Sequence, residues 1–219
     1  MNNTHSFSPD TLTAKGHAAK QKTRQTTFDL LRRSDYWMPD AEGGYLNGGW
    51  IELCGHHDET LKMLLDANAL RPGKGRYIGV NGSEEVIQAN QERYKDATEA
   101  GLVVWVLGTW ANTVSDLDRY PDARVVVFDG FNALSNTSIG RILRDSTDLA
   151  EDLYRRNGSV LLVMNFCLRG CATGAKDHCV EHLYQWRHRK NPGNGTKPAH
   201  KVYKSKRVPM LNVWLPLGF

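Results

Sequence analysis

The stretch WIELCGHHDET concentrates several chemically active side chains in one short segment. An apolar run ends at Glu52, and Cys54, Gly55, His56 and His57 follow before a helix-like sequence begins. A glycine lets a ligand approach the backbone closely, because no Cβ stands in the way. A histidine at such a turn can act as a base or bind a phosphate, or it can simply hydrogen-bond the loop. The segment therefore predicts a ligand site at a strand-to-helix turn.

Polar and aromatic side chains also follow the next three strand-like runs. Asn81 and Ser83 follow RYIGVN, Thr109 and Trp110 follow LVVWVLG, and Asp129 ends RVVVFD. Ligands of open α/β sheets bind beyond the carboxyl ends of the strands, so we expect these residues to gather near the first turn. Asp129 is the only ionisable residue in FDGFNAL, which makes it a candidate general base or substrate anchor. A carboxylate that caps a loop is the alternative.

The elements that would position these residues alternate between strand-like and helix-like runs from residue 50 onward. VVVF and VLLVM are short and continuously apolar, which is typical of strands covered on both faces. Such alternation favours a parallel sheet with right-handed crossovers. The last two runs, HKVYKSKRVPM and LNVWLPLGF, have no helix between them and predict an antiparallel hairpin. We therefore expect a doubly wound α/β fold with a seven-stranded, mostly parallel sheet closed by this hairpin.

The N-terminal part has a different character. Residues 1–25 are polar with scattered lysines, which predicts an arm that is flexible or draped over a partner. A short helix is expected across TTFDLLRRSDYW, and a loop across MPDAEGGYLNGG. The predicted organisation is thus a basic arm with a short helix over 1–46 and one domain over 47–219.

The segment from residue 50 to the C-terminus resembles the class I S-adenosylmethionine-dependent methyltransferases, which have a Rossmann-like fold. RYIGVNGSEEVIQAN is similar to the second strand and helix of that family, WIELCG to its first motif, VVVFDGFNAL to its fourth and GSVLLVMNF to its fifth strand. The closing hairpin separates this family from nicotinamide dehydrogenases, which would also require G-x-G-x-x-G after the first strand. The resemblance implies S-adenosylmethionine as cofactor and methyl transfer to an unidentified acceptor.

The resemblance also implies roles for the residues at the strand ends. Glu52 would orient the methionine end, Gly55 would allow close approach, Asn81 would hold the ribose, and Trp110 would stack on adenine. The other residues that it places at the cofactor are Cys54, His56, Ser83 and Thr109, while the catalytic candidates are Asp129 and His57.

The first turn and the ends of the next two strand-like runs depart from the family pattern. Cys54 and His56 stand where two glycines are usual, and Asn81 and Thr109 stand where acids are usual. Two accounts remain open. Either the pocket holds the cofactor in a variant way, or the fold is a catalytically inactive module that binds nucleic acid or a protein partner.

Positive charge is concentrated near the C-terminus. Residues 182–219 carry eight Lys and Arg and no acid, which leaves −4 for the rest because the whole chain carries +4. This polarity favours a nucleic acid as substrate or partner, although a solvated basic loop has the same composition. The DPPY-like and Pro-Cys signatures of DNA methyltransferases are absent. The candidate phosphate contacts are Arg187, Arg189, Lys190, Lys204, Lys206 and Arg207.

Composition sets further limits. The sequence contains no run of 18 uncharged apolar residues and no apolar leader at its start, so we expect no membrane span and a cytoplasmic location. Four unevenly spaced cysteines do not form a disulfide framework. The spacing of Cys167, Cys171, His178 and Cys179 is not a standard zinc pattern, and no metal site is predicted.

Overall fold

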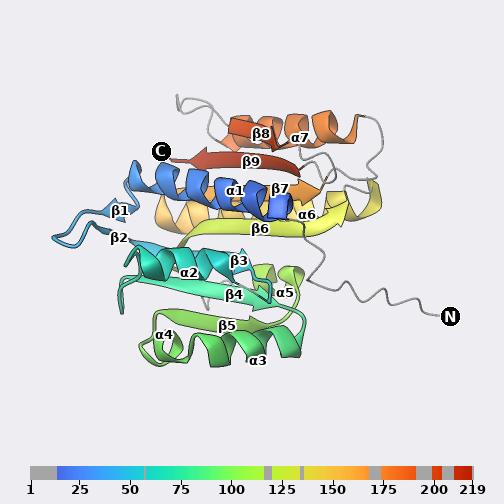
Figure 1. The fold of residues 1–219 in the computed structure, drawn as a ribbon. Helices are drawn as coiled ribbons and strands as arrows, with labels where there is room; N and C mark the ends of the chain where they lie inside the picture. The colour runs from blue at the N-terminus through green and yellow to red at the C-terminus, as the bar shows by residue number, and fades with distance from the viewer. Residues whose placement is uncertain are drawn as a thin grey trace.

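The computed structural model describes residues 14–56, 58–115, 120–133, 136–167, 174–190, 199–203 and 210–218. Its centre is a seven-stranded sheet with the order β5-β4-β3-β6-β7-β9-β8 (Figure 1). Five strands are parallel: β3 (Gly48–Leu53), β4 (Gly75–Asn81), β5 (Val103–Leu107), β6 (Ala123–Ala133) and β7 (Val160–Cys167). The strand β9 (Met210–Leu217) runs antiparallel to β7, and β8 (Ala199–Tyr203) runs antiparallel to β9. The predicted α/β class and the closing antiparallel hairpin are confirmed.

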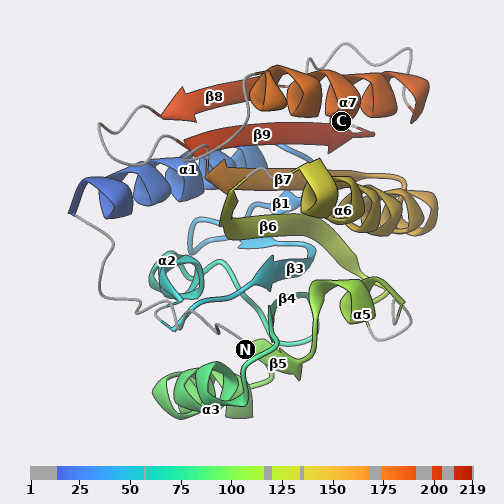
Figure 2. The same ribbon diagram turned by 90° about the vertical axis from the view of Figure 1, so that its right-hand side faces the viewer.

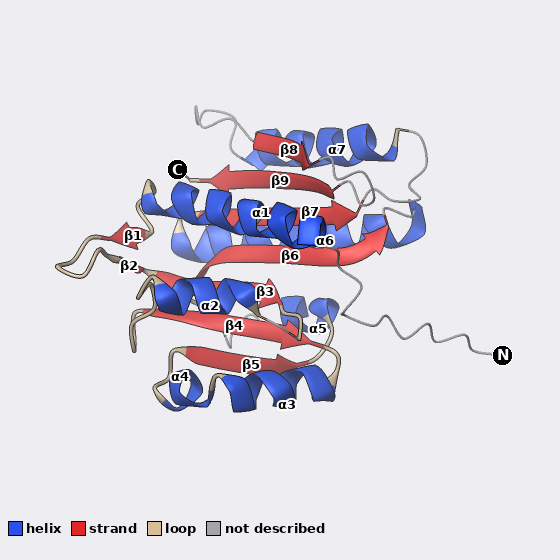
Figure 3. Ribbon diagram, viewed as in Figure 1, coloured by secondary structure: helices blue, strands red, loops and turns tan. Residues whose placement is uncertain are grey.

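Helices cover both faces of this sheet, which gives three layers (Figures 2 and 3). One face carries α1 (Ala14–Arg32), α2 (Glu59–Asp66), α3 (Glu84–Arg93) and α4 (Lys95–Glu99). The other face carries α5 (Trp110–Ser115), α6 (Asn136–Asn157) and α7 (Ala175–Lys190). Strands enclosed on both sides must be apolar throughout, which explains the continuous apolar runs of β6 and β7.

Helix α1 is the largest difference from the sequence-based expectation. The segment from Ala14 to residue 25, which was expected to be part of an arm, forms the first turns of this helix. The helix packs on the sheet through Thr23, Thr27 and Leu31, which are all buried and follow one another at a spacing of four residues. Two of these three residues are threonines, so the sequence shows little of the apolar periodicity that identifies a packed helix.

Two smaller elements were also not expected. A two-stranded sheet of β1 (Trp37–Met38) and β2 (Tyr45–Leu46) replaces the predicted loop after α1. Gly44 lies between these strands with φ of +94°, and a Cβ there would lie 2.1 Å from Nε1 of Trp37. A glycine is therefore required at that position. The short helix α5 occupies the segment after β5, for which no helix was predicted.

The two faces of the sheet bury different side chains. The face under α5, α6 and α7 is lined by aliphatic and phenylalanine side chains from β6, β7 and β9. The face under α1 and α2 is lined by larger aromatic residues, including Trp50, Tyr77 and Trp214.

Among the helices in the described ranges, none is long and apolar enough to cross a membrane.

Candidate functional site

The strand order reverses at β3, because the chain continues from it to β4 and β5 on one side and returns to β6 on the other. Such a switch point leaves a crevice at the carboxyl ends of the strands, where α/β proteins bind their ligands. The turn that follows β3 begins at Cys54 and ends at Asp58, the N-cap residue of α2. The sequence-predicted turn therefore lies at the switch point.

Side chains from β4 and α3 hold the first two carbonyl groups of this turn. Nδ2 of Asn81, the last residue of β4, donates to the carbonyl oxygen of Cys54 at 2.6 Å. Nδ2 of Asn90, a fully buried residue on α3, donates to the carbonyl oxygen of Gly55 at 2.8 Å. A turn that would otherwise be free to move is thus tied to two neighbouring elements.

The remaining described carbonyl groups of the turn are held in the same way. Nη1 of Arg93 donates to the carbonyl oxygen of His56 at 2.6 Å, and the hydroxyl of Tyr94 donates to the carbonyl oxygen of Asp58 at 2.9 Å. Together with Asn90, these residues follow an i, i+3, i+4 pattern, so one side of α3 and the residue after it faces the turn. The sequence-based prediction missed this group.

The orientation of the carbonyl groups fixes that of the next amides. In a trans peptide group the carbonyl oxygen and the following N–H point in opposite directions, and no cis peptide bond occurs in the described residues. Because the carbonyls of Cys54 and Gly55 point toward Asn81 and Asn90, the N–H groups of Gly55 and His56 point to the opposite side. Consecutive N–H groups of this kind can bind an anion.

Gly55 leaves open space beside these amides. A Cβ built at this residue would have no atom within 4 Å, and its backbone is not left-handed. Gly79 differs, because a Cβ there would lie 2.6 Å from the ring of Trp105. Packing explains the glycine at position 79, whereas the glycine at position 55 is exposed and a side chain there would begin in open space.

Cys54 does not fill this space. Its side chain is buried, and its Sγ donates to the carbonyl oxygen of Val80 on β4 at 3.4 Å. Burial raises the pKa of the thiol well above its ordinary value, so the sulfur is neutral and not nucleophilic near pH 7. Cys54 therefore joins the ends of β3 and β4.

Asn81 retains hydrogen-bonding capacity beyond the turn. Its Oδ1 accepts from the backbone N–H of Ser83 at 2.8 Å, and the hydroxyl of Ser83 caps α3 by accepting from the N–H of Val86. An amide has two donor hydrogens and two acceptor lone pairs, and the described contacts use one of each. The half-buried Asn81 can thus both hold the turn and bind a hydroxyl group.

Asp58 is a further residue that the sequence-based prediction missed. Its side chain accepts from the N–H of Leu61 at 3.0 Å and from the hydroxyl of Tyr77 at 2.5 Å. Burial raises the pKa of this carboxyl group to about 6, although the two donors favour its ionised form. Its place directly before the apolar pattern of α2 is an N-cap signal that the sequence already contained.

Glu52 lies below the turn, on the face that α1 and α2 cover. Its Oε2 accepts from Nε1 of Trp50 at 2.8 Å, and its Oε1 accepts from the hydroxyl of Thr60 at 3.0 Å. The residue is only 4% exposed. The carboxylate is therefore part of a buried network and does not face the open side of the turn.

The two residues predicted after β5 have separate environments. Thr109 is exposed, and its hydroxyl bonds the side chain of Asn112 at the start of α5. Trp110 is buried, with Nε1 donating to the hydroxyl of Ser146 at 2.9 Å and its ring packed edge-to-face against Phe128. The indole ring fills the core between α5, α6 and β6, so the structure does not bring it to the turn.

The catalytic candidates are only partly covered by the structure. The backbone of Asp129 lies in β6 and pairs with Asn165 of β7, so this residue is near the carboxyl end of its strand. Its side chain and the whole of His57 lie outside the described residues. Their predicted roles stay predictions.

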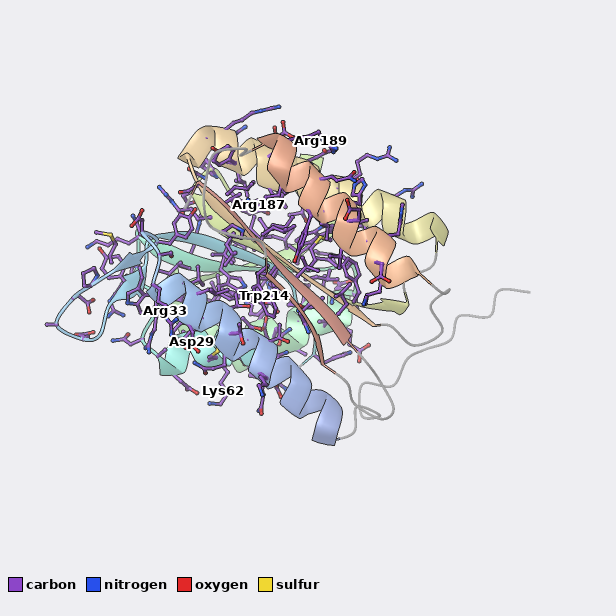
Figure 4. All side chains as sticks on the ribbon, turned by 90° about the horizontal axis from the view of Figure 1, so that it is seen from above. Asp29, Arg33, Lys62, Arg187, Arg189 and Trp214 are labelled. Atoms are coloured by element: carbon purple, nitrogen blue, oxygen red, sulfur yellow. The ribbon has the colours of Figure 1, made fainter. Side chains whose placement is uncertain are left out.

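The predicted phosphate contacts do not share one environment. Arg187 is buried, its Nε donates to the carbonyl oxygen of Pro216 at 3.2 Å, and burial lowers its pKa. It therefore packs α7 against the end of β9, whereas Arg189 is exposed on the same helix (Figure 4). Lys190 ends α7 with an undescribed side chain. The other three candidates, Lys204, Lys206 and Arg207, lie outside the described residues.

Comparisons with known proteins agree on the fold. No known family profile matches the chain, and no curated protein matches its sequence. The cofactor-bound Rv0187 protein from MTB is similar in structure, with a TM-score of 0.56, 13% identity and coverage of 96% of this chain and 83% of that one. The O-methyltransferase TomG from Streptomyces achromogenes, solved with SAM, gives a TM-score of 0.55, 14% identity and coverage of 90% and 80%.

Two further structures complete this comparison. The human methyltransferase 10 domain containing protein gives a TM-score of 0.54 at 10% identity and coverage of 91% of this chain and 82% of that one. The chain spans 61% of an uncharacterized protein from Listeria monocytogenes serotype 4b. The chain thus has the fold of the class I S-adenosylmethionine-dependent methyltransferases, as its sequence indicated.

Proposed function

We propose that this chain binds S-adenosylmethionine at the turn after β3 and transfers its methyl group to an acceptor. The fold supports this proposal, because solved structures that share it include a methyltransferase with SAM bound. The observation that carries it is the open space at Gly55, next to two amides that point away from α3. The residues of this turn fit the cofactor even though two of the usual glycines are replaced.

Residues of the turn and of the adjoining strand ends would bind different parts of the cofactor. The N–H groups of Gly55 and His56 would hold the carboxylate of its methionine end. The remaining donor and acceptor of Asn81 would hold the ribose hydroxyls. Glu52 would contribute negative charge from below the turn, without direct contact through its already bonded oxygens. The sulfonium supplies an activated methyl group, so the chain has to provide mainly alignment.

The acceptor would meet the methyl group near the end of β6. Asp129 is the residue there that we propose as general base or substrate anchor, since a carboxylate can accept the proton that the acceptor loses. A nucleic acid is one class of acceptor consistent with the basic C-terminal residues, among which Arg189 is exposed in the structure.

Calorimetry with S-adenosylmethionine and S-adenosylhomocysteine tests the proposal. We expect micromolar binding that weakens at least about tenfold in Gly55→Trp, because the indole would occupy the open space. Lys95→Trp is the matched control, since this exposed residue lies on α4, before β5, and its side chain forms an ion pair with Glu99 of the same helix. Its affinity should equal that of the wild type. Asn81→Ala should also weaken binding.

Two results would count against the proposal. One is the absence of binding heat in the folded wild-type protein. The other is an equal affinity of Gly55→Trp and Lys95→Trp. Salt-sensitive retention on RNA or DNA without cofactor binding would instead support a catalytically inactive module.

A further inference from the structure

A small cavity lies between helix α1 and the central sheet. Its volume is about 10 Å³, and it is enclosed by residues from α1, β3, α2, β6, β7 and β9. Seven of the ten residues around it have polar or charged side chains, which is unusual for the interior of a three-layer α/β protein. The residues around it are Thr23, Arg24, Thr27, Trp50, Glu52, Thr60, Val127, Val163, Asn165 and Asn212.

Two asparagines in this lining face each other across neighbouring strands. Asn165 of β7 and Asn212 of β9 are register partners, and they are 6% and 1% exposed. Oδ1 of Asn212 accepts from the hydroxyl of Thr23 on α1 at 3.0 Å. The residues that flank the pair on the same face of the sheet, such as Val163 and Trp214, are apolar. The two amides are therefore polar groups whose neighbours on β7 and β9, on the same face of the sheet, are apolar.

One polar atom of each amide lacks a hydrogen-bond partner among the described residues. These atoms are Oδ1 of Asn165, an acceptor, and Nδ2 of Asn212, a donor. A buried polar group without a partner costs about 1 to 3 kcal/mol, and such groups are rare in folded proteins. Both residues line the same cavity, so one bound molecule can satisfy both atoms.

The chemistry of the cavity selects the kind of molecule. The molecule must accept a hydrogen bond from Asn212 and donate one to Asn165. A metal cation could not accept from the amide, and a deprotonated anion could not donate to Oδ1 and would face the carboxylate of Glu52. Water does both, and a cavity of roughly 10 to 15 Å³ holds one water molecule.

We propose that this cavity binds one ordered water molecule, which bridges Asn165 and Asn212 beneath α1 and lies beside Glu52. The water completes a polar layer that runs from Thr23 and Arg24 on α1 to the sheet. Arg24 belongs to this layer because its Nε donates to the hydroxyl of Thr60, which in turn donates to Glu52. This site needs no cofactor and is independent of the proposed function.

A high-resolution crystal structure of the full chain tests the site directly. We expect one density peak within hydrogen-bonding distance of both Oδ1 of Asn165 and Nδ2 of Asn212. An empty cavity, a direct bond between the two amides, or a peak with the short coordination distances of a metal ion would overturn the proposal.

Water ¹⁷O magnetic relaxation dispersion gives a second test in solution, because it counts long-lived internal waters. The variant Asn165→Leu/Asn212→Leu should lose one such water relative to the wild type. Gln88→Leu, which replaces an exposed amide on α3, is the control and should lose none. A folded double variant that keeps the full count would contradict the site. If that variant does not fold, the wild-type crystal structure still decides.

Discussion

The two faces of the central sheet are built on different principles. The face under α5, α6 and α7 is held by apolar packing, in which side chains such as Leu162, Val126 and Leu215 are fully buried. The face under α1 and α2 includes a connected polar layer around Glu52 and Thr60. Polar groups are costly to bury unless they are paired, so the hydrogen bonds within this layer offset the cost of burying it.

The largest expected effect on the free energy of unfolding comes from a substitution in the core of the apolar face. Leu162→Ala should lower the free energy of unfolding by about 3 kcal/mol, because it removes buried methyl groups and leaves a cavity between β7 and the helices. Chemical denaturation measures this change. Leu30→Ala is the control, since Leu30 is 38% exposed on α1, and it should change the free energy by less than about 0.5 kcal/mol. Equal losses in the two variants would show that β7 is not part of a packed core.

The second effect concerns the carboxyl group of Asp58 on the polar face. Burial raises the pKa of this group from 3.8 in the unfolded chain to about 6 in the folded protein. Between pH 3.8 and about 6, the folded state therefore binds more protons than the unfolded state. The stability that this group contributes is fully present below about pH 4 and is lost as the pH rises to about 6. The loss is at most about 3 kcal/mol, since each unit of pKa corresponds to about 1.4 kcal/mol.

Asp58→Asn tests this pH dependence, because the amide cannot titrate and its oxygen can still accept from Leu61. The stability of this variant relative to the wild type should rise between pH 4 and 6 and then level off. Tyr77→Phe removes a donor that favours the ionised form of Asp58, and so it should move the change to higher pH. Parallel stability curves of wild type and Asp58→Asn across this range would show that the folded pKa is not raised.

The smallest effect tests the connection within the polar layer. Thr60→Val keeps the side-chain shape but removes the hydroxyl that donates to Glu52 and accepts from Arg24. We expect a loss of about 1 to 2 kcal/mol, because the buried Glu52 and the half-buried Arg24 each lose one hydrogen bond. Thr26→Val, which removes a hydroxyl that bonds the carbonyl oxygen of Lys22 one turn earlier in α1, should cost less than about 0.5 kcal/mol. If both variants behave alike in thermal and chemical denaturation, Thr60 is not a connecting residue.

The sequence was sufficient for the sheet because apolar runs of four or five residues are a local signal. VVVF and VLLVM indicate strands covered on both faces, and the final pair of runs without a helix indicates the hairpin. Helix α1 was underestimated because its buried face is built partly from Thr23 and Thr27, whose partners lie far away in the chain. Trp214 on β9, for example, donates to Thr27 from 187 positions away.

The candidate site could be located but not assembled from the sequence. A strand that ends at Glu52 and continues into Cys54 and Gly55 predicted the position of the turn. Asn81, which holds the first carbonyl of the turn, was predicted at the site, whereas the other side chains that hold it come from residues 35 to 37 positions later, such as Asn90 and Arg93, and bond to backbone carbonyls. Side-chain bonds to a distant backbone leave no pattern of residue types. The burial of Trp110 against Ser146, a contact between two side chains 36 positions apart, likewise leaves no local signal in the sequence.

A crystal structure of the chain with S-adenosylhomocysteine tests the central claim most directly. We predict that the carboxylate of this compound lies within hydrogen-bonding distance of the amides of Gly55 and His56, and that its ribose contacts the side chain of Asn81. The claim would be contradicted by an open space at Gly55 that stays free of ligand density at saturating concentration, or by a His56 side chain that occupies it.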